Sequence, residues 1–493
     1  MQDNKNNLSE IEILDQKIID NKELTLFEAL IPVVILMIML AYNIFFAAGE
    51  LLGEYSTQII LLMGGGIASI IGFLNKVSIK IMIAEIWENL KSIFLPVMIL
   101  LLVGALAGTW LVSGIIPAMV YYGLQVLSPA IFLPSSVIIA SIISTATGSS
   151  WTTSATVGIA LVGIGTALGI PTGMIAGAVV SGAYFGDKMS PLSDTTNLAP
   201  AMAGTDLFTH IRYMAITTVP TITITIIVFG IMGLTVDTVG TTDISGLLNT
   251  IKTTFNITPY LFIVPLTVIV LILTKTKPLT ALGIGVIMAA VFAFIFQPEL
   301  LSSLATSNLK AIVNAVFLDT EIVTDNAQLN DLFSSGGMKG MLWTVFLICC
   351  AMFFGGIMDA IGALAKVTKE LLKLATSIFG LFFSTVLSCI GLNAIASDQY
   401  LAIVIPGKMF KKAFEDKELA PENLSRTLED AGTVTSALIP WNTCGAYQSG
   451  VLGVAVTDYA VYAIFNWLSP IMTLIFAGFR IKIKQLATNK SKV

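Results

Sequence analysis

Residues 181–212, SGAYFGDKMSPLSDTTNLAPAMAGTDLFTHIR, bring charged side chains into a strongly hydrophobic part of the sequence. These charged residues include Asp187, Lys188, Asp194 and Asp206. An ionisable group at bilayer depth is costly unless it faces a wet cavity or a partner, so it is a candidate functional residue. Pro191 lies just beyond Asp187, and a break in a helix frees backbone carbonyls that can bind a cation. The sequence predicts a cation site around Asp187. The alternative, a cytoplasmic loop with solvated charges, suits Asp194 and Asp206 better.

Two further groups of polar residues also lie in apolar segments. The three groups are Thr145, Thr147, Ser149, Ser150, Thr152 and Thr153; Asp187, Ser190, Asp194, Thr195, Thr196 and Asn197; and Asn393, Ser397, Asp398, Gln399, Thr433, Thr435, Ser436, Asn442 and Thr443. Hydroxyl, amide and carboxylate oxygens suit a hard cation such as Na⁺, and a proton would compete for the same carboxylates. We therefore predict that Asp187, Asp194 and Asp398 bind a transported Na⁺. For any single Ser or Thr, the alternative is helix packing or a bond to its own backbone.

Composition sets the fold class. The 493 residues are 55% hydrophobic and 12% charged, whereas soluble domains carry roughly a quarter charged residues. This predicts an all-α polytopic membrane protein. The four cysteines have no CxxC spacing and there is one histidine, His210, so neither a disulfide framework nor a histidine metal centre is expected. We expect no cofactor other than the transported ions.

Apolar stretches long enough to cross a bilayer predict about 12 to 14 transmembrane or re-entrant helices. The predicted stretches are 26–48, 57–74, 92–113, 115–133, 135–150, 155–180, 212–236, 258–274, 279–297, 341–363, 374–396, 397–409, 433–455 and 456–478. We divide the chain into a polar tail (1–25), a transporter domain (26–478) and a basic cytoplasmic tail (479–493). Within the domain, two related halves span roughly 26–236 and 258–478.

Basic residues predict the orientation, because cytoplasmic loops are rich in Lys and Arg. The C-terminal tail and the segment after residue 407 are the main basic segments, with Lys408, Lys411, Lys412, Lys417, Arg426, Arg480, Lys482, Lys484, Lys490 and Lys492. The acidic segment 299–339 should lie outside. Both termini are then cytoplasmic, and His210 is expected at a solvated cytoplasmic edge beside Arg212.

A weak internal repeat supports two halves with broken helices. Ser141, Thr145, Gly148 and Ser154 share their spacing with Ser384, Ser388, Gly391 and Ser397. Interrupted hydrophobic segments in corresponding positions of two halves indicate the binding site of a transporter. Whether the repeat is parallel or inverted stays open.

Enzyme motifs fit poorly. The sequence has no HExxH and no GxxxxGK[ST], and YFGD at 184–187 lacks the first glycine of GxGD. We therefore expect no enzyme and no direct use of ATP. A conductive channel is a weaker alternative, because no filter signature is present.

The run GAYFGDKMSPLSDTTNLAPAMAGTDLFTHIRYM closely resembles the NhaC family of Na⁺/H⁺ antiporters, as do ATVGIALVGIGTALGIPTGMIAGAVVSGAYFGD and EDAGTVTSALIPWNTCGAYQSGVLGV. The resemblance covers about residues 30 to 480. It implies a secondary antiporter of the bacterial inner membrane, in an ion-transporter superfamily built from inverted repeats with broken helices near the midplane. Asp187, Ser190, Asp194, Thr195, Thr196 and Asn197 stand in the family's signature run, Asn442 and Thr443 in a later motif, and Asp398 in the SDQY segment.

We therefore expect a secondary active antiporter that exchanges cytoplasmic Na⁺ for external H⁺ by alternating access. The alternative is Na⁺- or H⁺-coupled exchange of a small organic acid or amino acid, of the malate/lactate type. The position of the Lys188 side chain distinguishes these functions. If its ammonium points to the site, exchange of an organic anion is favoured; if it reaches the cytoplasmic interface, cation exchange is favoured. The expected partners are Na⁺, H⁺ and lipid, with no nucleic acid; a homo-oligomer stays open.

Overall fold

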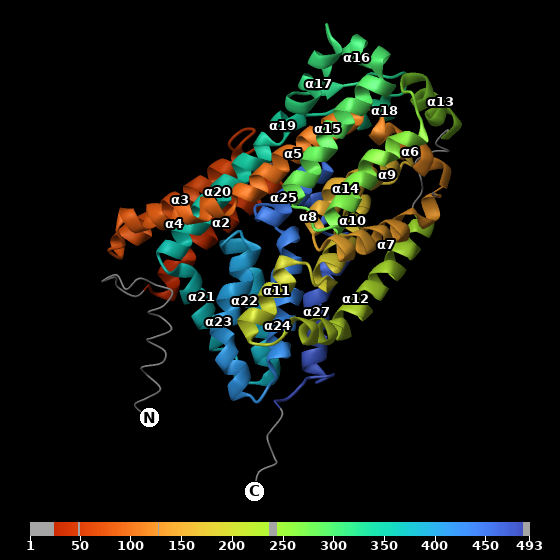
Figure 1. Ribbon diagram of the computed structural model, residues 1–493. Coiled ribbons are helices and arrows are strands. Elements are labelled where there is room, and N and C mark those ends of the chain that lie inside the picture. Colours follow the sequence, from red (N-terminus) through yellow and green to blue (C-terminus); the bar gives the residue numbers. More distant parts are fainter. Residues whose placement is uncertain (1–23, 48–49, 127, 236–243, 487–493) are drawn as a thin grey trace, which may run out of the picture. The chain divides into compact units, whose positions relative to one another are not determined.

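The computed structural model describes residues 24–486, apart from 48–49, 127 and 236–243 (Figure 1). Most of the predicted polar tail, 1–25, and the end of the basic tail therefore lie outside the described residues. The described chain is almost entirely helical, with one small antiparallel sheet of β1 (Thr320–Glu321) and β2 (Ser334–Ser335). The predicted all-α class is confirmed.

The chain divides into two compact units. The first comprises residues 1–92 and 349–370. Its helices are α2 (Leu26–Phe46), α3 (Ser56–Leu74), α4 (Ile79–Ser92), the later turns of α20 (Leu342–Ala360) and most of α21 (Ala363–Leu372). Thr25 begins α2 with a capping box, in which its side chain and that of Glu28 each accept the other's backbone N–H.

The second unit, residues 93–348 and 371–493, contains all the predicted site residues. Its first helices are α5 (Phe94–Val112), α6 (Ile115–Val126), α7 (Pro129–Thr147), α8 (Ser150–Thr153), the π-helix η1 (Ser154–Gly158), α9 (Ile159–Ala167), α10 (Thr172–Met189), α11 (Asp194–Ala203) and α12 (Leu207–Thr235). Next come α13 (Ile244–Thr254), η2 (Pro259–Phe262), α14 (Ile263–Leu273), α15 (Pro278–Phe296), α16 (Pro298–Leu304), α17 (Asn308–Phe317), α18 (Ala327–Leu332) and α19 (Gly337–Gly340). The last are α22 (Ile378–Ile395), α23 (Gln399–Asp416), α24 (Pro421–Leu428), the π-helix η3 (Glu429–Thr433), η4 (Ser436–Leu438), α25 (Thr443–Leu452), α26 (Val456–Tyr459) and α27 (Ile464–Gly478).

Eight helical segments in the described residues are long and apolar enough to cross a membrane, or up to ten if two bent pairs each count as one span. The bent pairs are α13 with η2–α14 and α16 with α17, with bends of 84° and 72°. This confirms a polytopic membrane protein. Several predicted continuous segments are broken. For example, 155–180 divides at Gly169 (φ +75°) and Pro171, and 433–455 divides into η3, η4 and α25. Both glycine in the left-handed region and proline interrupt a helix.

Close packing of α10 against α7 positions the end of α10 (Figure 1). A Cβ on Gly182 would lie 2.3 Å from the carbonyl oxygen of Val137, and one on Gly186 would lie 2.5 Å from that of Ser141. Small residues four apart let two helix backbones approach in this way. The approach places Asp187, the next residue, beside the end of α7.

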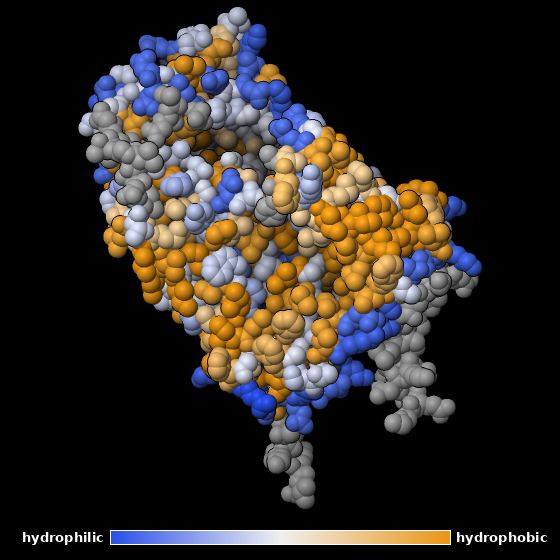
Figure 2. All heavy atoms as spheres, turned by 180° about the vertical axis from the view of Figure 1, so that it is seen from behind, coloured by the Kyte–Doolittle hydropathy of each residue, from blue (hydrophilic) through white to orange (hydrophobic). Residues whose placement is uncertain are grey.

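Large apolar side chains are exposed on the outer helices. Ile142 on α7 and Ile227, Ile231 and Leu234 on α12 are 55% to 77% exposed, and Figure 2 shows a broad zone of hydrophobic side chains on the face drawn. Such a surface suits lipid, because lipid tails are as apolar as these side chains.

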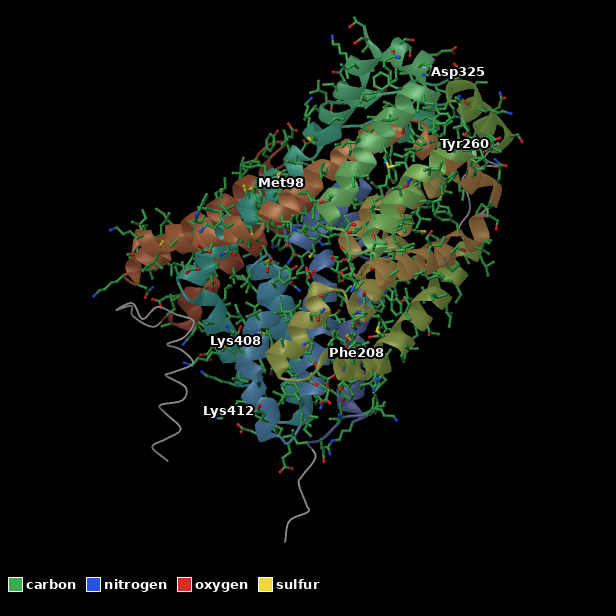
Figure 3. The ribbon with its side chains drawn as sticks, viewed as in Figure 1. Met98, Phe208, Tyr260, Asp325, Lys408 and Lys412 are labelled. Carbon is green, nitrogen blue, oxygen red and sulfur yellow. The ribbon has the colours of Figure 1, made fainter. Side chains whose placement is uncertain are left out.

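The basic segments lie together at one end of the second unit. Leu419 and Gln485 form an antiparallel bridge, and the Ala420 N–H donates to the Lys484 carbonyl (3.0 Å). Figure 3 shows Lys408 and Lys412 toward this end and Asp325 at the opposite end. The separation of basic and acidic segments in the sequence is therefore a separation in space.

Candidate ion-binding site

Asp187 lies in the last turn of α10, which ends at Met189 because Ser190 is extended and Pro191 follows. Its Oδ2 accepts two hydrogen bonds from Ser150, one from the backbone N–H (3.0 Å) and one from the hydroxyl (2.7 Å). Ser150 begins α8 after the helix break at Gly148 (φ +70°), with Ser149 as the N-cap. Asp187 is only 9% exposed. Two helix breaks therefore meet at one buried carboxylate.

The loop after α10 is held by its own side chains. The Thr196 hydroxyl donates to the carbonyls of Asp187 (3.2 Å) and Lys188 (3.1 Å). Asn197 donates from Nδ2 to the carbonyls of Pro191 (3.0 Å) and Ser193 (2.7 Å). Carbonyls freed by the break are thus already hydrogen-bonded, so Thr196 and Asn197 position the loop.

The remaining residues of this run differ in exposure. Ser190 is buried at the C-cap of α10, and its Oγ accepts from the Leu192 N–H (3.3 Å). Thr195 is buried beside Ser193, with hydroxyl oxygens 3.2 Å apart. Asp194 is exposed at the start of α11.

Thr145 and Thr147 bond to their own helix. The Thr145 hydroxyl donates to the Ser141 carbonyl (2.7 Å), and that of Thr147 lies 3.4 Å from the Ser144 carbonyl. Such a hydrogen bond to the residue's own helix is the alternative to ion binding for a single Ser or Thr. The predicted role of both residues in ion binding stays a prediction.

Asn393 and Asn442 join the broken helical segments near the C-terminal end of the second unit. Asn393 donates from Nδ2 to the Gly432 carbonyl (2.6 Å) and to the Thr435 hydroxyl (3.1 Å). Asn442, the N-cap of α25, donates to the backbone carbonyl (2.9 Å) and the Oδ1 (3.2 Å) of Asn393. Both side chains are fully buried.

Ser397, Thr443 and Ser436 complete this junction. Ser397 has a positive φ of +59°, and its carbonyl accepts from the Thr443 N–H (3.0 Å). The Ser436 hydroxyl donates to the Thr433 carbonyl (2.6 Å). Residues 378–452 therefore also contain two interrupted helical segments that meet at polar residues.

Asp398 is the N-cap of α23, where its Oδ1 accepts from the Leu401 N–H (3.0 Å). Asp398, Asp194 and Asp187 all act electrostatically on the Tyr400 hydroxyl, with Asp194 the strongest. Within the described ranges, no group of three or more His, Cys, Asp or Glu residues could hold a metal ion. A cation here would therefore need hydroxyl or carbonyl ligands besides a carboxylate.

Direct contacts join the earlier and later polar groups. The Trp151 and Tyr447 rings stack with centroids 3.9 Å apart, and the Tyr447 hydroxyl donates to the Trp151 carbonyl (3.2 Å). Trp151 belongs to α8 and Tyr447 to α25. Segments almost 300 residues apart, |i−j| = 296, thus line one region.

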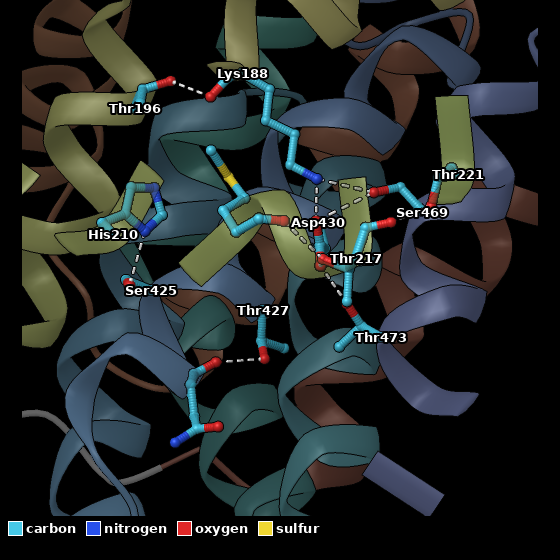
Figure 4. A network of polar contacts seen from close by, with 12 residues as sticks. Lys188, Thr196, His210, Thr217, Thr221, Ser425, Thr427, Asp430, Ser469 and Thr473 are labelled. Carbon is cyan, nitrogen blue, oxygen red and sulfur yellow. Dashed lines mark hydrogen bonds and ion pairs between the residues drawn. The ribbon is translucent and has the colours of Figure 1, made fainter. Parts of the chain in front are cut away.

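A buried ion pair between Lys188 and Asp430 was not predicted (Figure 4). Asp430 Oδ1 also accepts from the Ser469 hydroxyl (3.2 Å), and Oδ2 accepts from the hydroxyls of Thr217 (3.0 Å) and Thr473. Both charged side chains are 0% exposed. The alternative that Lys188 reaches the cytoplasmic interface is wrong, because its ammonium is inside the helix bundle.

Two other expectations about charged residues are wrong. His210 is 0% exposed instead of solvated, with Nδ1 2.8 Å from the Ser425 hydroxyl oxygen. Arg426 is fully buried in α24 instead of lying in a cytoplasmic loop, and it stacks over the Tyr213 ring (4.7 Å). The sequence signal for the missed Asp430 was its place beside Glu429, directly before the small-residue run AGTVTSA.

Residues 182–480 match the Na⁺/H⁺ antiporter family. The Na⁺/H⁺ antiporter NhaC of Alkalihalophilus pseudofirmus is 38% identical, over 86% of this chain and 91% of that protein. This chain belongs to the Na⁺/H⁺ antiporter family. NhaC of Bacillus subtilis is 37% identical, over 79% of this chain and 84% of that protein. The malate-2H⁺/Na⁺-lactate antiporter of Bacillus subtilis is 34% identical, over 90% of this chain and 92% of that protein. The resemblance to NhaC antiporters is thus confirmed.

Proposed function

We propose that this protein is a secondary active antiporter that exchanges cytoplasmic Na⁺ for external H⁺ by alternating access. The observation that carries the proposal is the buried carboxylate of Asp187 at the junction of two broken helices, in a chain of the Na⁺/H⁺ antiporter family. Ion sites of secondary transporters are built at such breaks.

Asp187 can hold either ion. A carboxylate offers about four acceptor positions, and the two Ser150 donors occupy only part of them. A bound Na⁺ needs oxygen ligands, which nearby hydroxyls supply, while a proton neutralises the same carboxylate. Because the two ions share these oxygens, the release of one permits binding of the other, and exchange follows if the site opens alternately to each side.

Transport in proteoliposomes tests the function. An imposed Na⁺ gradient should drive proton movement, and an imposed pH gradient should drive Na⁺ movement, with no third solute present. Failure of both movements in a correctly folded preparation would contradict the proposal.

A second function is exchange of a small organic acid or amino acid coupled to Na⁺ or H⁺. The relative named malate-2H⁺/Na⁺-lactate antiporter favours it, as does Arg426, whose buried guanidinium nitrogens have no hydrogen-bond partner in the described chain. Lys188 does not favour it, because Asp430 already neutralises that charge. Adding malate or lactate to the same proteoliposomes separates the functions: dependence of Na⁺ movement on either acid would replace the first proposal.

The inner membrane of a bacterium is the proposed location, with both termini cytoplasmic. The common end formed by the segment around Leu419 and the C-terminal residues around Gln485 supports this orientation. Basic segments remain cytoplasmic during insertion.

A further inference from the structure

Glu429 and Asp430 are adjacent carboxylates with opposite surroundings. Asp430 receives donors on both oxygens, from Lys188, Ser469, Thr217 and Thr473. Glu429 is equally buried, at 0% exposed, yet neither of its oxygens has a hydrogen-bond partner among the described residues. An ionised carboxylate without donors is strongly disfavoured in an interior. The surrounding residues therefore do not compensate a negative charge on Glu429 in the way that they compensate the charge of Asp430.

The local backbone gives this residue an unusual setting. Glu429 begins η3, a π-helical turn of residues Glu429–Thr433, and π-helical turns occur frequently at functional sites. The buried hydroxyl of Thr433, at the other end of this turn, makes no hydrogen bond of normal geometry in the described part of the chain, but it interacts with the Glu429 carboxyl. A carboxylate and a hydroxyl on one short turn are thus both left with unused oxygens.

Charged groups close to Glu429 come from α10 and from its own turn. Lys188, Asp187 and Asp430 act on it electrostatically, in decreasing order. Lys188 and Asp430 also act electrostatically on His210 of α12. Since Asp430 balances Lys188, the pair leaves Glu429 without a counter-charge of its own.

The contacts that other elements make with η3 and the residue after it come from neutral groups. From α22, Asn393 donates to the Gly432 carbonyl. From α23, Ile403 and the backbone of Ala402 lie against Gly432. From α27, Asn466 donates to the carbonyl of Val434, directly after the turn. The titratable residues on these helices and on α11 and α24 include Cys389 of α22, Tyr400 of α23, Asp194 of α11, and Glu422 and Arg426 of α24.

We propose that Glu429, with the hydroxyl of Thr433, forms a second site that binds a proton or a monovalent cation alternately, separate from the Asp187 carboxylate. The proposal rests on the antiport function above. In the proton-bound state the carboxyl is neutral, so its burial has no large cost. In the cation-bound state the ion replaces the missing donors, and Thr433 supplies a neutral ligand.

Na⁺ binding to the purified full-length protein tests this site directly, by calorimetry and by the Na⁺-dependent rise in melting temperature. Glu429→Gln keeps the size of the side chain and removes its charge, so calorimetry should show one Na⁺ fewer per protein, with binding at this site weakened by at least about tenfold while the Asp187 site still binds. Its melting temperature without Na⁺ should stay close to that of the wild type, because no hydrogen bond is lost. Glu429→Asp should retain part of the binding, since a carboxylate remains.

Glu422→Gln is the matched control. Glu422 lies on the adjoining helix α24 and pairs with the half-exposed Lys484 (2.5 Å), so this variant should bind Na⁺ like the wild type. If Glu429→Gln does not fold, Thr433→Val carries the test and should weaken Na⁺ binding while Glu422→Gln does not.

The outcomes separate this site from the antiport function. If Glu429→Gln, or Thr433→Val in its place, binds as many Na⁺ as the wild type and with an affinity within about twofold, the second site is overturned, whatever its exchange rate. The antiport function still stands in that case, provided that the wild type exchanges Na⁺ for H⁺. Absence of exchange by the wild type would instead overturn the antiport function on which this site rests.

Discussion

Asp187 and Lys188 are neighbours at the end of α10, but their side chains contact different parts of the protein. Asp187 faces Ser150 at the break before α8 and is the candidate ion ligand. Lys188, one residue on, points to the other side and pairs with Asp430. Successive residues on a helix diverge by about 100°, so one helix end supplies a carboxylate to one place and an ammonium to another.

Replacing Asp187 by Asn should abolish Na⁺-driven proton movement, at least about 100-fold below the wild type, with near-normal expression. The amide can neither release a proton nor supply a charged oxygen, yet it fills the same space. Proteoliposome exchange rates measure the effect.

Asp206→Asn is the control for this variant. Asp206 is exposed and accepts from the Thr209 N–H (3.0 Å) at the start of α12, and these hydrogen bonds with Thr209 hold the pKa of Asp206 below its usual value. Asn is also a good N-cap, so exchange should persist. Wild-type rates in Asp187→Asn would remove Asp187 from the mechanism.

Helix packing sets the position of Asp187. Gly186 touches α7 so closely that a Cβ there would lie 2.5 Å from the Ser141 carbonyl oxygen and the Thr145 backbone nitrogen. These are backbone atoms, which move only together with the helix. The spacing between α7 and α10 thus controls the contact between Asp187 and Ser150.

Gly186→Ala should destabilise the protein by about 1–3 kcal/mol through overpacking and should also reduce exchange. Gly230→Ala on α12 is the matched control, because nothing lies within 4 Å of its added Cβ. Thermal unfolding in detergent and exchange rates measure both variants. Equal unfolding temperatures and exchange rates in the two variants would show that neither stability nor exchange depends on the close approach of α10 to α7.

Across the whole second unit, charge separates the two ends. Lys412 lies toward one end and Asp325 at the other (Figure 3). With the proposed orientation, Lys412→Cys in a cysteine-free variant should react with a membrane-impermeant thiol reagent only in inside-out vesicles, and Asp325→Cys only in right-side-out vesicles. The reverse labelling pattern would mean that the termini are external.

The competition of Na⁺ and H⁺ should be visible in the whole protein. Over the pH range in which a site carboxyl is protonated, each unit of rising pH should lower the apparent Na⁺ dissociation constant by up to about tenfold per competing proton. Na⁺-dependence of exchange measured at several pH values gives this slope.

His210→Gln tests the competing explanation, a histidine sensor. The slope should survive this substitution, since direct competition needs only carboxylates. Loss of the slope in His210→Gln, together with its survival in Asp187→Asn and Asp194→Asn, would establish His210 as the origin of the pH dependence instead.

The sequence by itself determined the membrane class, the family and the position of the first helix break. Hydropathy is a property of consecutive residues, and Pro191 ends α10 wherever that helix packs. The N-caps Ser193, Asp398 and Asn442 were likewise among or next to the predicted polar residues, because capping is local.

Only the tertiary structure decided which charges meet. Lys188 and Asp430 are 242 residues apart in the sequence. Neither local sequence indicates that the two side chains meet. For the same reason His210 and Arg426, both expected near water, are buried. Whether a polar side chain is satisfied depends on donors from other helices, so four donors surround Asp430 and none reaches Glu429 among the described residues.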